Sequence, residues 1–194
     1  YSRFTQLFLV PFTGYGLGAF FCFYYQTYYD EWTRWEPKII QIADGDYQWV
    51  YLSAFVFSIM SNSLNNYPTV HKMKIMTYNS SNLRSNMFIY KLAAEGSPES
   101  RVILSTDGDE GRYNRANRSL YHFLENSMPM IFGIALNSWV FPRIVFYLTM
   151  LMFVGRFFYT QQITRHGFGL HRAAFYMIII SHYMLGGMTI IISV

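Results

Sequence analysis

The sequence predicts an all-α integral membrane protein with about five transmembrane helices. Two observations carry this prediction. Hydrophobic residues make up 52% of the chain and charged residues only 13%, whereas about a quarter of the residues in a soluble domain are charged. Three stretches, 4–29, 47–70 and 173–194, contain no Asp, Glu, Lys or Arg. Each of them is long enough to cross a hydrocarbon layer of about 30 Å as a helix.

The first predicted span, 4–29, ends in a dense run of aromatic residues, which is typical of the headgroup level of a bilayer. A short acidic connector, 30–46, follows it. The single cysteine, Cys22, lies inside this span and has no partner for an internal disulfide. Because a bulky residue such as Tyr1 is not what removal of an initiator Met leaves, we expect a segment before it, and an organelle presequence would fit.

The second predicted span, 47–70, becomes polar toward its end, so we expect it to leave the membrane early, near Pro68. A polar stretch, 71–118, comes next. It is too long for a bare connector and contains several turn-forming Gly and Pro residues. We therefore expect the main extramembrane region of the protein here.

The last three predicted spans are 119–141, 144–164 and 173–194, and their very short connectors make neighbouring helices antiparallel. If successive spans cross the membrane in alternating directions, eleven of the 15 Lys and Arg residues lie at the end of the bundle that holds the N-terminus. Loops rich in Lys and Arg are retained on the cytosolic or matrix side. The retention of Lys and Arg on one side of the membrane therefore accounts for the net charge of +4. Because the charge needs no nucleic acid to explain it, we expect no nucleic-acid partner.

A polar cluster inside the membrane is the main candidate site. Arg118, His122 and Glu125 stand at i, i+4 and i+7, so they share one face of a helix. A carboxylate at this depth costs a few kcal/mol without a partner. The next span presents Arg156 and Tyr159 at a similar depth, and we expect Arg156 to neutralise Glu125. The cluster fits either a site for an anionic, hydrogen-bonding ligand or a purely structural salt bridge, and both interpretations stay open.

Other polar residues give weaker signals. His182 lacks a second ligand at metal spacing, so we expect a packed side chain and no metal site. His166 and His171 are expected in a solvated loop. The sequence contains no P-loop, dinucleotide-binding glycine pattern, metalloprotease motif or nucleophile elbow.

Three motifs lie in and around the cluster. They are the run Arg115-x-x-Arg118-x-x-x-His122-Phe-Leu-Glu125-Asn126, then Phe141-Pro142-Arg143, and then Gly155-Arg156-Phe-Phe-Tyr159. These motifs resemble the MAPEG family, the membrane-associated proteins of eicosanoid and glutathione metabolism, and most closely its microsomal glutathione transferase type. The resemblance extends from about residue 46 to the C-terminus. It implies a four-helix transmembrane bundle over 47–194 that forms trimers, with 1–46 as an added helix and connector.

The resemblance also implies that glutathione binds between neighbouring subunits. Arg118, Glu125, Arg156 and Tyr159 match the positions that bind it in the family. With Arg115 and His122 they form our predicted ligand site, for glutathione or a lipid headgroup.

The motifs depart from the family pattern in four places. His122 replaces an Asn, the proline after Glu125 is displaced by about one residue, and Ile163 stands in the place of a second tyrosine. The thiolate-stabilising Arg of the family has only Arg165 and Arg172 as neighbours of its place. These two residues are therefore catalytic candidates only if the protein is an enzyme.

We favour a divergent, non-catalytic member that acts as an accessory subunit of a larger membrane complex, such as a respiratory assembly of the mitochondrial inner membrane. The endoplasmic reticulum membrane is the alternative location. The added N-terminal helix and an apparent insertion, 74–101, would supply docking surface for other membrane subunits. A bound phospholipid fits this function. The alternative is a homotrimeric, glutathione-dependent transferase or peroxidase acting on lipophilic electrophiles.

Overall fold

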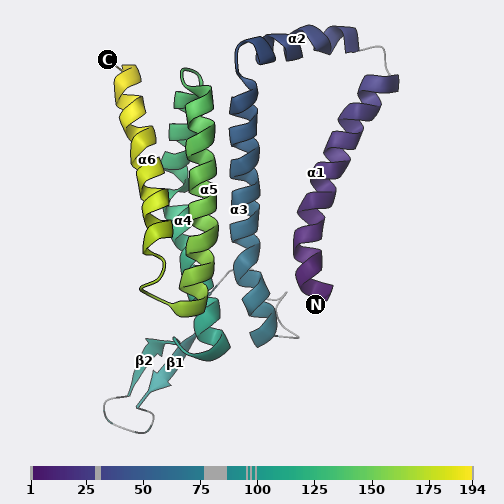
Figure 1. Cartoon of the computed structure of the whole chain (residues 1–194). Helices are drawn as coiled ribbons and strands as arrows, with labels where there is room; N and C mark the ends of the chain where they lie inside the picture. The colour runs from purple at the N-terminus through teal and green to yellow at the C-terminus, as the bar shows by residue number, and fades with distance from the viewer. Residues whose placement is uncertain are drawn as a thin grey trace.

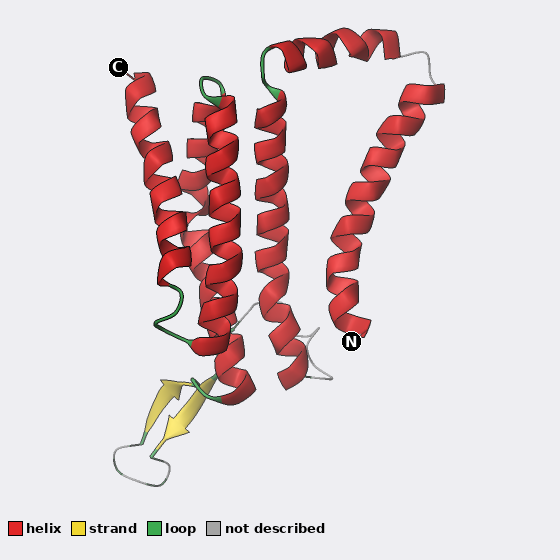
Figure 2. Cartoon of the chain, in the orientation of Figure 1, coloured by secondary structure: helices red, strands yellow, loops and turns green. Residues whose placement is uncertain are grey.

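A computed structural model describes residues 2–28, 32–76, 87–94, 96, 98 and 100–193. These residues form six helices and one antiparallel hairpin (Figures 1 and 2). In chain order the elements are α1 (Ser2–Tyr28), α2 (Trp32–Asp44), α3 (Gln48–Ile75), β1 (Tyr90–Ala93), β2 (Arg101–Leu104), α4 (Gly108–Ser138), α5 (Pro142–His166) and α6 (Arg172–Ser193).

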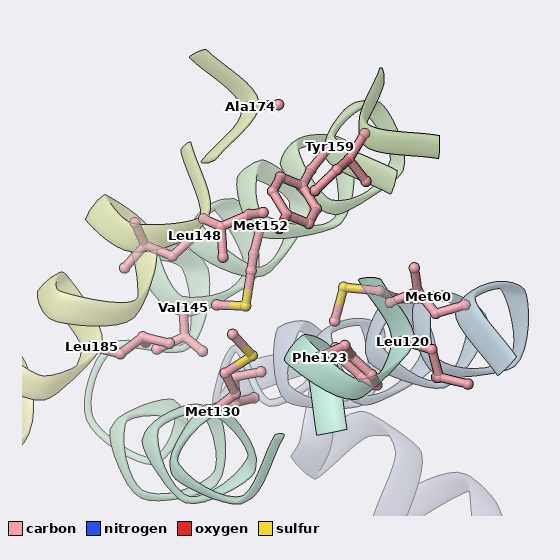
Figure 3. Close-up of a cluster of buried hydrophobic side chains, with 14 residues drawn as sticks. Met60, Leu120, Phe123, Met130, Val145, Leu148, Met152, Tyr159, Ala174 and Leu185 are labelled. Carbon is pink, nitrogen blue, oxygen red and sulfur yellow. The ribbon is translucent and has the colours of Figure 1, made fainter. Parts of the chain in front are cut away.

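Helices α3 to α6 pack side by side as a bundle (Figure 1). Helix α1 contacts this bundle at α3, where the hydroxyl of Tyr15 lies 3.1 Å from Oγ of Ser58 and accepts a hydrogen bond of 2.9 Å from Asn62. Buried side chains from all four bundle helices meet in one hydrophobic core (Figure 3). The core consists of Met60, Leu64, Leu120, Phe123, Met130, Ile134, Val145, Leu148, Met152, Tyr159, Ile163, Ala174, Ile178 and Leu185. The predicted four-helix bundle over 47–194 therefore has its counterpart in α3 to α6.

Two of the described helices, α5 and α6, are long and apolar enough to cross a membrane by length and composition alone. Their most apolar windows have mean hydropathy values of 1.3 and 1.7. Helices α1, α3 and α4 are longer than α5 and α6 but do not meet both criteria. For these three helices the crossing of the membrane stays a prediction.

The two ends of the bundle are arranged as the alternation of helices predicts. At one end, Arg143 donates a hydrogen bond of 2.8 Å to Asp46 and so joins the turn before α3 to the first turn of α5. This guanidinium lowers the pKa of the Asp46 carboxyl. At the other end, Arg115 donates to the carbonyl oxygen of Thr164, 3.1 Å away, and so joins the start of α4 to the end of α5.

The prediction of a simple acidic connector at 30–46 is wrong in one respect, because most of this segment forms helix α2. Its apolar residues recur at helical spacing, with Trp35, Ile39 and Ile42 on one side and charged residues on the other. The helix lies across the ends of α1 and α3 (Figure 1). A helix of this kind lies in the membrane interface with its apolar face toward the acyl chains.

Two helix ends also differ from the predicted ones. Helix α3 continues past Pro68 to Ile75, because the buried residues Pro68 and Lys72 pack against the bundle beyond the expected end. Helix α4 begins at Gly108, about three turns before the predicted start of its span at Ser119. Both helices therefore extend out of the predicted membrane-spanning part.

The extramembrane region contains a hairpin, so the all-α prediction is wrong there. Strands β1 and β2 pair antiparallel, with Tyr90 opposite Leu104 and Leu92 opposite Val102. The hairpin projects from the end of the bundle where α4 begins (Figure 2). Part of the predicted insertion at 74–101 lies outside the described residues.

Side chains from the first turns of α4 hold the hairpin in place. The buried Asn114 accepts a hydrogen bond from the backbone N–H of Ile89 (2.9 Å) and donates to the carbonyl oxygens of Ile89 (2.7 Å) and Ser105 (2.8 Å). Tyr113 donates to the carbonyl oxygen of Met87, 2.8 Å away. A two-stranded hairpin is only marginally stable alone in water, so these bonds fix its position.

We expect Asn114→Ala to release the hairpin without unfolding the bundle. The substitution removes the partner of the backbone N–H of Ile89 and of the carbonyl oxygen of Ser105, at about 1–3 kcal/mol each. The carbonyl oxygen of Ile89 keeps the backbone N–H of Ser105 as a donor. Amide hydrogen exchange in 87–94 and 101–105, measured by mass spectrometry in detergent, should accelerate at least tenfold, while exchange in α5 and α6 stays unchanged. Asn126→Ala is the control, because Asn126 donates only within α4, to the carbonyl of His122. Unchanged exchange in the hairpin would show that Asn114 is not its anchor.

Candidate functional site

The predicted shared face on α4 is present. Arg118 Nη1 and Glu125 Oε1 lie 3.2 Å apart, which requires both side chains on the same side of the helix. The two side chains are 59% and 53% exposed. The pair therefore faces outward from the bundle of one chain, where a ligand or another subunit can reach it.

The expected neutralisation of Glu125 by Arg156 is wrong. Glu125 pairs with Arg118 of its own helix. Arg156 is only 1% exposed, and its Nη1 lies 2.8 Å from Nδ1 of His122. Since a guanidinium can only donate, Nδ1 accepts this bond and the proton of the neutral ring is on Nε2. Helical periodicity correctly predicted that Arg156 lies level with the polar residues of α4. It did not predict that the partner of Arg156 is His122.

Rings from α5 and α6 pack around His122 of α4, the hydrogen-bond partner of Arg156. The ring of His122 lies 5.7 Å from that of Tyr159 and 6.1 Å from that of Phe175, measured between centroids. His171 packs edge-on against Tyr159 at 5.4 Å. The prediction of a solvated His171 is thus wrong, because Phe175 follows it by one helical turn and holds this face against Tyr159.

Three arginines of the predicted site, Arg115, Arg165 and Arg172, have no contact with this ring cluster among the interactions of the described residues. Arg115 has its donors occupied by the carbonyl oxygens of Thr106 and Thr164. Arg165 and Arg172 are exposed, at the end of α5 and the start of α6. Arg165 lies within electrostatic range of Tyr67 on α3. Arg115 therefore ties backbone segments together in this structure, and the roles of Arg165 and Arg172 stay predictions.

The place of the second tyrosine of the family is filled by a core residue. Ile163 is buried and belongs to the hydrophobic core. It lies one turn after Tyr159, whose ring does contact the polar cluster. The cluster thus has one phenol from this helix face, and Ile163 contributes no hydrogen-bond donor.

The end of the bundle next to the hairpin is strongly basic. His71, on the last turns of α3, has its pKa lowered to about 4 by burial and by the nearby cations Lys74 and Arg112. His71 is therefore neutral at pH 7, and the positive charge comes from lysine and arginine. An anion is attracted to this end of the protein.

The comparisons with known proteins agree with the architecture. The model of the MAPEG family matches residues 48–193, which are α3 to α6 with the hairpin between them. Helices α1 and α2 lie outside the match. No curated protein and no solved structure matches the chain.

Proposed function

The chain belongs to the MAPEG family and is an integral membrane protein, and we propose that it is a non-catalytic member that serves as an accessory subunit of a larger membrane assembly. The proposed location is the mitochondrial inner membrane. Fractionation of cells that express the tagged chain distinguishes this location from the endoplasmic reticulum membrane.

The observation that carries this proposal is an apolar face on the extramembrane hairpin. Residues alternate between the two faces of a strand pair, so Tyr90, Leu92, Val102 and Leu104 share one face. All four are exposed, and Val102 is the most exposed at 69%. On the opposite face, Lys91 makes an ion pair of 2.6 Å with Asp107, at the start of α4. An exposed apolar face on a firmly anchored hairpin is suited to bind a partner protein.

The polar cluster supports the non-catalytic part of the proposal. Glutathione transfer needs a donor or cation that stabilises the thiolate. Ile163 supplies neither, since it is packed into the core. The residues that match the family, Arg118 and Glu125, already pair with each other.

Native electrophoresis tests the accessory role. The tagged chain, extracted with digitonin from the membranes in which it resides, should migrate in one discrete assembly much larger than a trimer of the 22.9 kDa chain. The double substitution Leu92→Thr and Val102→Thr should release it from that assembly. Threonine keeps a high strand propensity, so the hairpin itself is retained.

Ile103→Thr is the matched control, because Ile103 lies on the other face of the same strand. It should leave the migration unchanged. A chain that migrates only as a homotrimer, or a double variant that stays in the assembly, would contradict the accessory role.

A second function is favoured by the outward-facing pair Arg118 and Glu125 beside the buried Arg156. This arrangement leaves ligand-binding groups where a neighbouring subunit would cover them, which fits a glutathione-dependent transferase or peroxidase acting on lipophilic electrophiles. Stopped-flow absorbance of the glutathione thiolate tests it with the purified protein. Thiolate formation that disappears in Arg118→Ala would favour the enzyme over the accessory subunit.

A further inference from the structure

A cavity of about 290 Å³ lies between α3 and α5. This is the side of Arg156 away from the ring cluster of α4 and α6. Four apolar residues, Met60, Leu64, Phe153 and Phe157, form much of its wall. Its polar wall residues include Ser63, Thr160 and Gln161. The cavity is thus mainly apolar and near the lower end of the size range of small-molecule sites.

Arg156 completes the wall of this cavity. Its Nη1 is bound to His122, but its Nε and Nη2 are buried and have no hydrogen-bond partner among the described residues. These two nitrogens form one edge of the guanidinium, with parallel N–H bonds. That edge matches the two oxygens of a carboxylate or a phosphate.

We propose that the cavity between α3 and α5 binds the anionic head of a membrane amphiphile, with its oxygens on the free edge of Arg156. Both nitrogens are buried in this structure, so the proposed binding includes a turn of the guanidinium that brings this edge to the cavity. The hydroxyl of Ser63 and the amide of Gln161 supply further hydrogen bonds to the head, whereas the hydroxyl of Thr160 is already bonded to Ser119 at 2.7 Å.

Two features, the depth of Arg156 and an apolar exit, favour an amphiphile over a small water-soluble anion, and a third attracts any anion. Arg156 is ten residues before the end of α5 at His166, which is about 15 Å along the helix axis. An anion at this depth must leave water, and a hydrocarbon chain offsets that cost. The rim residue Phe157 is half exposed, so a chain that leaves the cavity passes between apolar side chains. The basic end of the bundle, with Lys74 and Arg112 near His71, attracts the anion.

Native mass spectrometry of the full chain in detergent tests the proposal with four probes: oleate, palmitoyl-oleoyl phosphatidylglycerol, the uncharged oleyl alcohol, and glutathione. We expect one of the two anionic amphiphiles to bind at least tenfold more tightly than oleyl alcohol. Preference for oleate identifies a carboxylate as the head, and preference for the phospholipid identifies a phosphate. Retention of glutathione alone, or equal retention of oleate, phospholipid and alcohol, would overturn the proposal.

Substitutions locate the bound probe. Arg156→Met should weaken binding of the anionic amphiphile at least tenfold, and Arg156→Lys should restore part of it. Ser63→Phe should block the cavity while it leaves Arg156 in place. Ser61→Phe is the control, two positions away on the same helix and outside the cavity wall. Binding that survives both Arg156→Met and Ser63→Phe would overturn the proposal. Because the hairpin is untouched in these variants, their results are independent of the accessory role.

Discussion

Gly155→Val is expected to lower the midpoint of thermal unfolding by about 6–12 °C. Helices α5 and α6 approach each other closely at Gly155. A Cβ atom on Gly155 would lie 3.0 Å from the carbonyl oxygen of Ala174 and 3.0 Å from Cβ of Met177. Backbone cannot yield as a flexible side chain does, so α6 must move outward. Overpacking of this kind costs about 3 kcal/mol, and 1 kcal/mol corresponds to about 2–4 °C in a chain of this size.

The measurement is intrinsic tryptophan fluorescence during heating in detergent. Gly186→Val is the matched control, because Gly186 is also a helical glycine and a Cβ there meets nothing within 4 Å. Its midpoint should change by less than about 2 °C. The displaced α6 also carries Phe175, so the ring contact with Tyr159 should loosen in Gly155→Val. Equal midpoints for the two valine variants would show that the approach of α5 and α6 is not tight.

The long helices could be predicted from the sequence because apolar runs in membrane proteins have a length fixed by the bilayer. The predicted spans 4–29, 144–164 and 173–194 differ from α1, α5 and α6 by only one or two residues at each end. The shared face of Arg118 and Glu125 also followed from helical period alone, and the 3.2 Å ion pair confirms it. These features depend on local spacing within one helix.

The features that were missed depend on contacts between distant segments. The hairpin has no strong strand pattern of its own, and it is held by Asn114, about 25 positions from Ile89. The partner of Arg156 depends on the rotation of α5 about its own axis, which the packing of Tyr159 and Ile163 sets. Helix α2 was also missed, but for another reason. Its signal is local, because the spacing of Trp35, Ile39 and Ile42 already indicates a helix.

In protein freed of bound lipid, Arg156→Met is expected to raise the unfolding midpoint by several degrees, although it removes a central residue of the candidate site. A buried cation loses its hydration, and Arg156 recovers a single hydrogen bond, to His122. Two of its donors stay without a partner among the described residues. Replacement of buried ionic groups by apolar residues of similar volume is often neutral or stabilising by about 1–4 kcal/mol. Methionine is flexible enough to fill the space.

The comparison with Arg118→Met makes this prediction specific to a buried charge. Arg118 is exposed and paired with Glu125, so its loss should change the midpoint little, since exposed pairs contribute about 0–1 kcal/mol. The double variant Arg156→Met, His122→Leu should be more stable than Arg156→Met, because it also removes the ring nitrogen that lost its donor. A midpoint that falls in Arg156→Met after lipid extraction would contradict this prediction. In protein that keeps its lipid a fall is expected, because the proposed anion is then the partner of the free edge.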